Sequence, residues 1–162
     1  MTDHISCVYQ RTYESLKNLY LNSLFMQKEF AKQESNVSGD HDTWKIGFLK
    51  EWCTVRIGGP RRSGHDSALF KLIDEFDLKG AVFYPMMAQA KIIKELHNPK
   101  NVIASSERAL ALNDGGSFRG YSGWNFVAVN CCSHTASTTL NNVYKLAEGY
   151  LTKDPFFIIL IQ

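Results

Sequence analysis

The 162-residue sequence has few cysteines, no long hydrophobic run and no low-complexity tract. Its four cysteines are too few for a disulfide framework, and the polar residues 1–10 lack the apolar segment of a secretory signal peptide. We therefore expect reduced thiols and a cytoplasmic protein. No stretch approaches the roughly 18 consecutive apolar residues that a membrane-spanning helix requires, so no membrane partner is expected.

The charges are nearly balanced, with 18 Lys and Arg against 16 Asp and Glu and a net charge of +2. This excess is too small to indicate a nucleic-acid-binding protein by itself. Hydrophobic residues make up 44% of the chain, which is enough to form a core and argues against intrinsic disorder. The length predicts a single domain.

Two kinds of pattern follow one another along the chain. Residues 11–32 repeat apolar side chains at helical spacing, and residues 44–52 predict a short second helix after the polar loop 33–43. From residue 53 onward, short β-prone runs alternate with helical segments. The expected strands are 53–57, 80–84, 101–104, 124–129 and 155–161, and the expected helices are 66–76, 86–96, 107–112 and 138–150.

This alternation predicts an α/β domain with a five-stranded, mainly parallel sheet between two helical layers, as a three-layer sandwich. Residues 1–50 would be an N-terminal helical extension, and residues 51–162 the α/β core. The pattern does not determine the strand order, so a flavodoxin-like or Rossmann-like sheet stays an alternative.

The segment between the first strand and the next helix concentrates glycine and positive charge. Gly59 and Gly64 have the G-x-x-x-x-G spacing of a P-loop, whose backbone amides surround a phosphate at a helix N-terminus. A plain turn with Asp66 as helix N-cap is the alternative, but it does not account for the three basic residues there. We expect an anion site formed by Gly59, Pro60, Arg61, Arg62, Ser63, Gly64, His65, Asp66 and Ser67, together with Asn130.

The strand 53–57 followed by Gly-Pro-Arg-Arg-Ser-Gly-His resembles the degenerate Walker A loops of phage-encoded P-loop ATPases, which are related to terminase and helicase motors. Residues 81–85 resemble the next strand of such motors, residues 124–130 their Walker B strand, and residues 156–162 the strand that ends in a polar sensor, here Gln162. The resemblance covers about two-thirds of the chain. It implies a P-loop-NTPase-like fold, a viral (phage) protein, ATP as ligand, and magnesium if Asp66 or Ser67 takes part.

The sequence departs from the P-loop pattern at the residues that perform catalysis. His65 stands where a P-loop has its lysine, and Asp66 stands where Ser or Thr holds magnesium. The Walker B-like strand ends in Asn130 rather than in a carboxylate. We therefore expect weak or absent ATP hydrolysis, with Arg61, Arg62 or Arg119 as substitute cations.

Two other functions remain open. Loss of the lysine and of the strand carboxylate suits a pseudo-ATPase that binds a host or phage protein, for example as an inhibitor. An accessory nucleic-acid binder would use Arg61, Arg62, Arg119 and nearby lysines, and its affinity would depend steeply on salt.

Cysteine and histidine also occur together after the fourth expected strand. Cys131, Cys132 and His134 suggest buried thiols, with a zinc site including Cys53 or His65, or a cysteine nucleophile with His134 as base, as alternatives. Asp40, His41 and Asp42 suit either a solvated loop or a weak metal site. We expect no metal at these two places.

Overall fold

The computed structural model describes residues 2–33, 48–58, 64–97, 101–108, 123–130, 137–150 and 155–161. The helices are α1 (Thr2–Gln33), α3 (His65–Glu75), α4 (Met87–His97) and α6 (Ser137–Tyr150), with one π-helical turn, η2 (Leu49–Cys53). The strands are β1 (Thr54–Ile57), β2 (Gly80–Tyr84), β3 (Val102–Ser106), β4 (Phe126–Asn130) and β5 (Phe157–Ile161).

All five strands are parallel and lie in the order β1-β5-β4-β2-β3. The prediction of an α/β protein with a five-stranded parallel sheet is thus confirmed. The first strand lies at an edge, whereas the flavodoxin-like and Rossmann-like orders place it inside the sheet, so neither alternative describes this topology.

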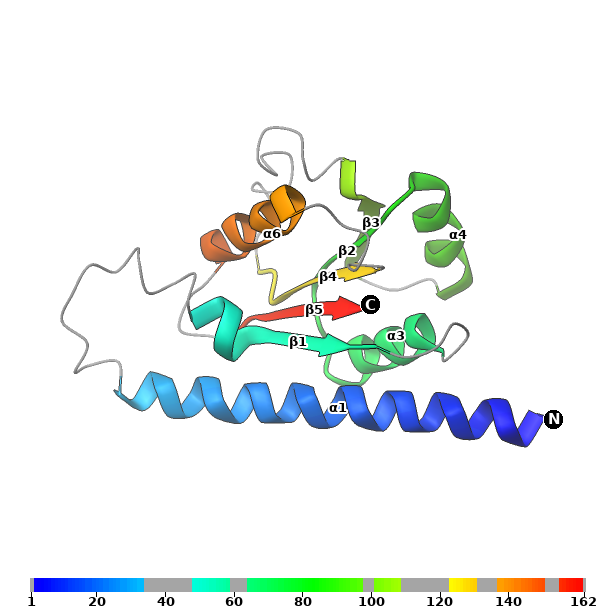
Figure 1. The fold of residues 1–162 in the computed structure, drawn as a ribbon, viewed down its shortest axis with the longest axis horizontal. Coiled ribbons are helices and arrows are strands. Elements are labelled where there is room, and N and C mark those ends of the chain that lie inside the picture. The colour runs from blue at the N-terminus through cyan, green and yellow to red at the C-terminus, as the bar shows by residue number, and fades with distance from the viewer. Residues whose placement is uncertain are drawn as a thin grey trace.

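The strand order explains which helices cover which face. The connections from β1 to β2 to β3 run across the sheet in one direction, and the later connections return, so their helices cover opposite faces. Val82 and Tyr84 share one core with α1, α3 and α4, while Ala81 and Phe83 share the other with α6 and η2. In Figure 1, α6 lies above β5, whereas α3 and α1 lie below β1.

The three central strands β5, β4 and β2 are buried along their whole length. Their apolar sequences follow from this position, because helices cover both faces of a parallel sheet. Gly80 is the first residue of β2 and lies close to the backbone of the neighbouring strand β4. A Cβ at this position would lie 1.9 Å from the carbonyl oxygen of Phe126. A larger residue therefore does not fit there.

Helix α1 is longer than the sequence pattern predicted, and it begins at Thr2 rather than near residue 11. Its buried side chains recur at alternating spacings of three and four residues, which is the pattern of a helix packed along one face. They are Tyr13, Leu16, Tyr20, Ser23 and Gln27. The helix runs along the edge strand β1 and across α3, so it contributes to the main core (Figure 1).

The other boundaries differ from the predictions by a few residues. Strand β3 extends to Ser106, beyond the predicted end at residue 104, and β4 starts at Phe126 rather than at residue 124. Of the predicted helix 44–52, the described part is Phe48 and the turn η2. The predicted helix 107–112 lies mostly outside the described residues.

A buried amide fixes the carboxyl-terminal half of α1 to the sheet. Gln27 Nε2 donates to the carbonyl oxygen of Phe156 at 2.9 Å, and the Phe156 N–H donates to Gln27 Oε1 at 3.0 Å. One turn earlier, Ser23 Oγ donates to the carbonyl oxygen of Trp52 at 2.6 Å. These bonds satisfy backbone groups just before β5 and within η2.

Replacing Gln27 by methionine keeps the length of the side chain but leaves the N–H and C=O of Phe156 without these partners. Loss of a hydrogen bond from a buried polar group costs about 1–3 kcal/mol, so we expect the loss of these two bonds to lower the free energy of unfolding by about 2–4 kcal/mol. Urea denaturation measures this change. Gln10→Met, at an exposed position of the same helix, is the matched control and changes stability by less than about 0.5 kcal/mol.

Candidate functional site

The parallel sheet brings the carboxyl ends of its strands to one edge, and helix α3 begins at that edge. Gly64 is the N-cap of α3, with φ 75° and ψ 30°, in the left-handed region that glycine adopts without strain. The predicted alternative of Asp66 as N-cap is wrong, because Asp66 is the second residue of the helix. The first backbone bond in this turn runs from the Ala68 N–H to the carbonyl oxygen of Gly64, at 2.9 Å.

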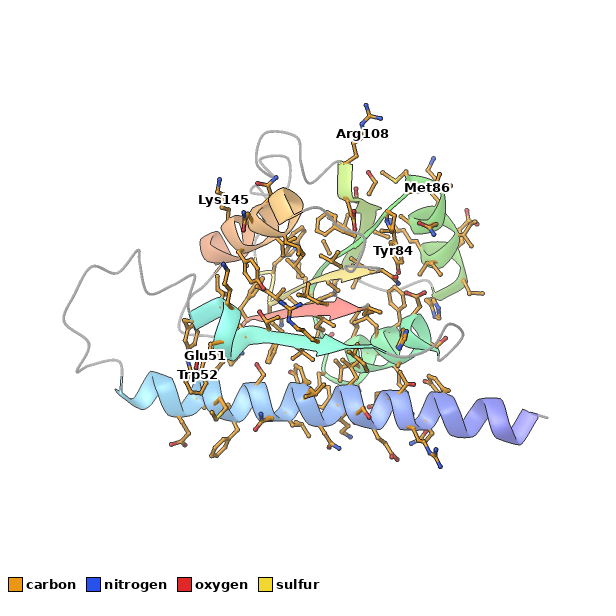
Figure 2. The ribbon with its side chains drawn as sticks, in the orientation of Figure 1. Glu51, Trp52, Tyr84, Met86, Arg108 and Lys145 are labelled. Atoms are coloured by element: carbon orange, nitrogen blue, oxygen red, sulfur yellow. The ribbon has the colours of Figure 1, made fainter. Side chains whose placement is uncertain are left out.

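Asp66 accepts hydrogen bonds from the ends of two strands. Asn130 Nδ2, at the end of β4, donates to Asp66 Oδ1 at 2.6 Å. The hydroxyl of Tyr84, at the end of β2, donates to the same oxygen at 3.2 Å. Figure 2 labels Tyr84 at this end of β2, just before Met86 and α4.

The register of the sheet explains why Asn130 and Tyr84 both reach Asp66. Strands β2 and β4 are neighbours, with Phe83 paired to Val129, so the residues that follow each of them end side by side. Both donors are almost entirely buried, while the Asp66 carboxylate is half-buried. Asp66 and Asn130, two of the residues expected to form the anion site, thus lie together at the carboxyl edge of the sheet.

His65 stands beside Asp66 at the start of α3. Its Nε2 atom is buried and has no hydrogen-bond partner within the part of the chain that the structure describes. A buried imidazole nitrogen without a partner has unused hydrogen-bonding capacity, which is unusual in a folded protein. His65 is itself one of the residues predicted to bind an anion.

The amino-terminal part of α1 covers the end of the loop. A Cβ on Gly64 would lie 3.1 Å from Tyr9 Cδ2, so Tyr9 packs directly against this glycine. The ammonium of Lys71, on α3, lies 4.1 Å from the ring centroid of Tyr13 and 5.7 Å from that of Tyr9. Helix α1 therefore supports the start of α3.

Several predicted residues lie outside the described ranges. They are Gly59, Pro60, Arg61, Arg62, Ser63, Arg119, Cys131, Cys132, His134, Gln162 and the three residues 40–42. Cys53, the last residue of η2, is described: its side chain is fully buried in the core, and burial raises the pKa of its thiol to about 12. This thiol is therefore protonated at neutral pH.

The chemistry of the described site is that of one carboxylate with neutral hydrogen-bond donors. No group of three or more His, Cys, Asp or Glu residues that could hold a metal ion is found among the described residues. Within the same residues, none of the helices is long and apolar enough to cross a membrane. A cation bound here would thus have Asp66 as its charged ligand.

No sequence pattern had indicated Tyr84 as a residue of this site. The position of Tyr84 in the sequence could have indicated it, because a polar side chain at the carboxyl end of a buried parallel strand lies where such folds bind ligands. Tyr9 could not have been found in this way, since its contact with Gly64 depends on how α1 packs.

The sequence matches no model of a known protein family, and it shows no significant similarity to a curated protein.

Asn130→Asp places a second carboxylate against Asp66. The two negative charges repel at the distance of a hydrogen bond, so we expect the melting temperature at pH 7 to fall by several degrees relative to the native protein. The difference shrinks at pH 4, because protonation of either carboxyl removes the repulsion, and it also shrinks when Mg²⁺ is added. Thermal unfolding measures both effects.

Asn22→Asp is the matched control, since Asn22 is exposed on α1 and away from this edge. Its melting temperature should follow that of the native protein at both pH values and with Mg²⁺. If Asn130→Asp and Asn22→Asp changed the melting temperature equally, this result would contradict the contact between residues 66 and 130.

Proposed function

We propose that the protein binds a nucleotide, with ATP as the expected ligand, or another phosphate compound, through residues 59–67, and that hydrolysis is weak or absent. The observation that carries the proposal is the position of Asp66: a carboxylate at the start of α3, fixed by donors from β4 and β2 at the carboxyl edge of a parallel sheet. Open α/β sheets bind their ligands at this edge.

The residues of the site fit a phosphate group. The N–H groups of residues 65–67 precede the first intrahelical bond of α3, and the positive end of the helix dipole lies there. Nε2 of His65, which has no hydrogen-bond partner among the described residues, adds a buried nitrogen that a phosphate oxygen could satisfy. Arg61 and Arg62 immediately precede these residues in the sequence and supply positive charge.

The site fits magnesium as the companion of the phosphate. A carboxylate next to a bare triphosphate would repel it, whereas a divalent cation between them removes the repulsion. Asp66 and the hydroxyl of Ser67 would hold this cation, because Mg²⁺ prefers oxygen ligands. Bound magnesium would neutralise phosphate charge.

The positions of the Asp66 carboxylate and the neutral Asn130 amide favour weak hydrolysis. The helix supplies the carboxylate and the strand supplies an amide, which is the reverse of the P-loop arrangement. Asn130 carries no charge with which to hold magnesium, and its amide already donates to Asp66. Stabilisation of charge in the transition state is therefore poor.

Calorimetric titration with ATP and ADP, with and without Mg²⁺, tests this function. We expect micromolar affinity for the magnesium complex, weakened by roughly 30-fold or more in Arg61→Ala/Arg62→Ala, since hydrogen bonds to charged groups contribute about 1.5–3 kcal/mol each. Asp66→Ala should lose the dependence on Mg²⁺. Phosphate release over hours should stay near the uncatalysed rate.

Lys91→Ala/Lys94→Ala removes the same number of positive charges from the exposed side of α4 and should bind as the native protein does. Absence of both heat and thermal stabilisation at millimolar nucleotide would contradict the proposed function.

The second candidate is a pseudo-ATPase that acts as a protein-interaction module for a host or phage partner. It is favoured by apolar side chains on and just before α4: Met86, Ile92 and Leu96 are 63%, 63% and 72% exposed. Apolar residues grouped on a surface often mark protein contacts. Measurable nucleotide turnover would count against this candidate.

A further inference from the structure

A cavity lies at the amino-terminal edge of the sheet, opposite the edge where α3 begins. Its volume is about 530 Å³, within the usual range of about 300–1,000 Å³ for small-molecule sites. It is formed by the carboxyl-terminal half of α1, the end of α3 and the segments that lead into β2, β4 and β5.

Aromatic rings form much of the wall. The Tyr20 ring contacts the rings of Phe76 and Phe157, with centroid distances of 4.5 Å and 4.3 Å, and Trp124 lines the same cavity. The two ring contacts hold Tyr20 in place, and burial raises the pKa of its hydroxyl, which therefore stays protonated at neutral pH. Such a wall favours a flat apolar ligand.

Asn125 connects the backbone segments around the cavity through hydrogen bonds. Its Oδ1 accepts from the N–H of Lys79 at 2.8 Å, its N–H donates to the carbonyl oxygen of Lys79 at 2.8 Å, and its carbonyl oxygen accepts from the Phe157 N–H at 2.9 Å. The entries to three strands are thus fixed relative to one another. Because Oδ1 is occupied, the NH₂ group of Asn125 is oriented, and no described residue accepts from it.

The described lining of the cavity carries one charged side chain, that of Lys28, which is a cation. Among the described residues no carboxylate lines the cavity, and Lys28 makes no ion pair with any of them. None of the described residues hydrogen-bonds to the Tyr20 hydroxyl. A further ammonium is near, since Lys79 Nζ lies 3.7 Å from the position that a Cβ on Gly123 would occupy.

We propose that this cavity binds a small amphipathic anion: a flat apolar ring that packs against Tyr20 and Trp124 and carries a carboxylate bound by Lys28 and the Asn125 amide. The charge of the lining argues for an anion, and the aromatic wall argues for a ring. The site is independent of the proposed nucleotide function, because it shares no residue with the edge where Asp66 lies.

Calorimetric titration with 2-naphthoate, and with the neutral 2-naphthylmethanol for comparison, tests the proposal. We expect submillimolar affinity for 2-naphthoate and at least fivefold weaker binding of the alcohol. Lys28→Gln should weaken naphthoate binding by roughly tenfold, because a charged partner is lost. Lys91→Gln, at an exposed position of α4, should leave it unchanged.

A second variant removes the space rather than the charge. Leu24→Trp fills the cavity from α1 and should abolish naphthoate binding while the melting temperature stays within a few degrees of the native value. Arg61→Ala/Arg62→Ala should bind naphthoate normally, so loss of nucleotide binding and loss of this site are distinguishable. The proposal is overturned if naphthoate does not bind at millimolar concentration, or binds equally to Lys28→Gln.

Discussion

The parallel pairing of five short strands is the constraint on which the rest of the structure depends. Such a sheet requires helical crossovers, and in the order β1-β5-β4-β2-β3 these crossovers cover both faces. The central strands are consequently apolar and buried. Because all strands point the same way, their carboxyl ends and the start of α3 share one edge, and their amino ends share the other.

Hydrogen bonds of buried polar groups then fix the side chains and the backbone at each edge of the sheet. At the carboxyl edge, Asn130 and Tyr84 orient the carboxylate of Asp66 at the start of α3. At the amino edge, Gln27 and Asn125 satisfy backbone groups that the short strands leave unpaired. Buried amides of this kind are costly unless every partner is present, so they fix one arrangement of the chain. The long helix α1 spans both edges.

The sequence predicted the elements well and their arrangement poorly. Apolar runs such as β5 identified the buried strands, and the glycine-rich loop indicated where α3 begins, because local patterns encode both features. Tyr84 and Tyr9 were not identified, since their roles come from the register of β2 against β4 and from the packing of α1 on Gly64. The position of β1 at the sheet edge likewise results from long-range pairing.

Backbone amide NMR of the ¹⁵N-labelled protein with Mg²⁺–ADP would test the central claim, that phosphate binds where Asp66 meets the ends of β4 and β2. We predict saturable shifts at residues 64–67 and at Tyr84 and Asn130, with little change at Asn125 on the opposite edge. Unchanged signals at residues 64–67, or shifts confined to the amino-terminal edge, would contradict the account.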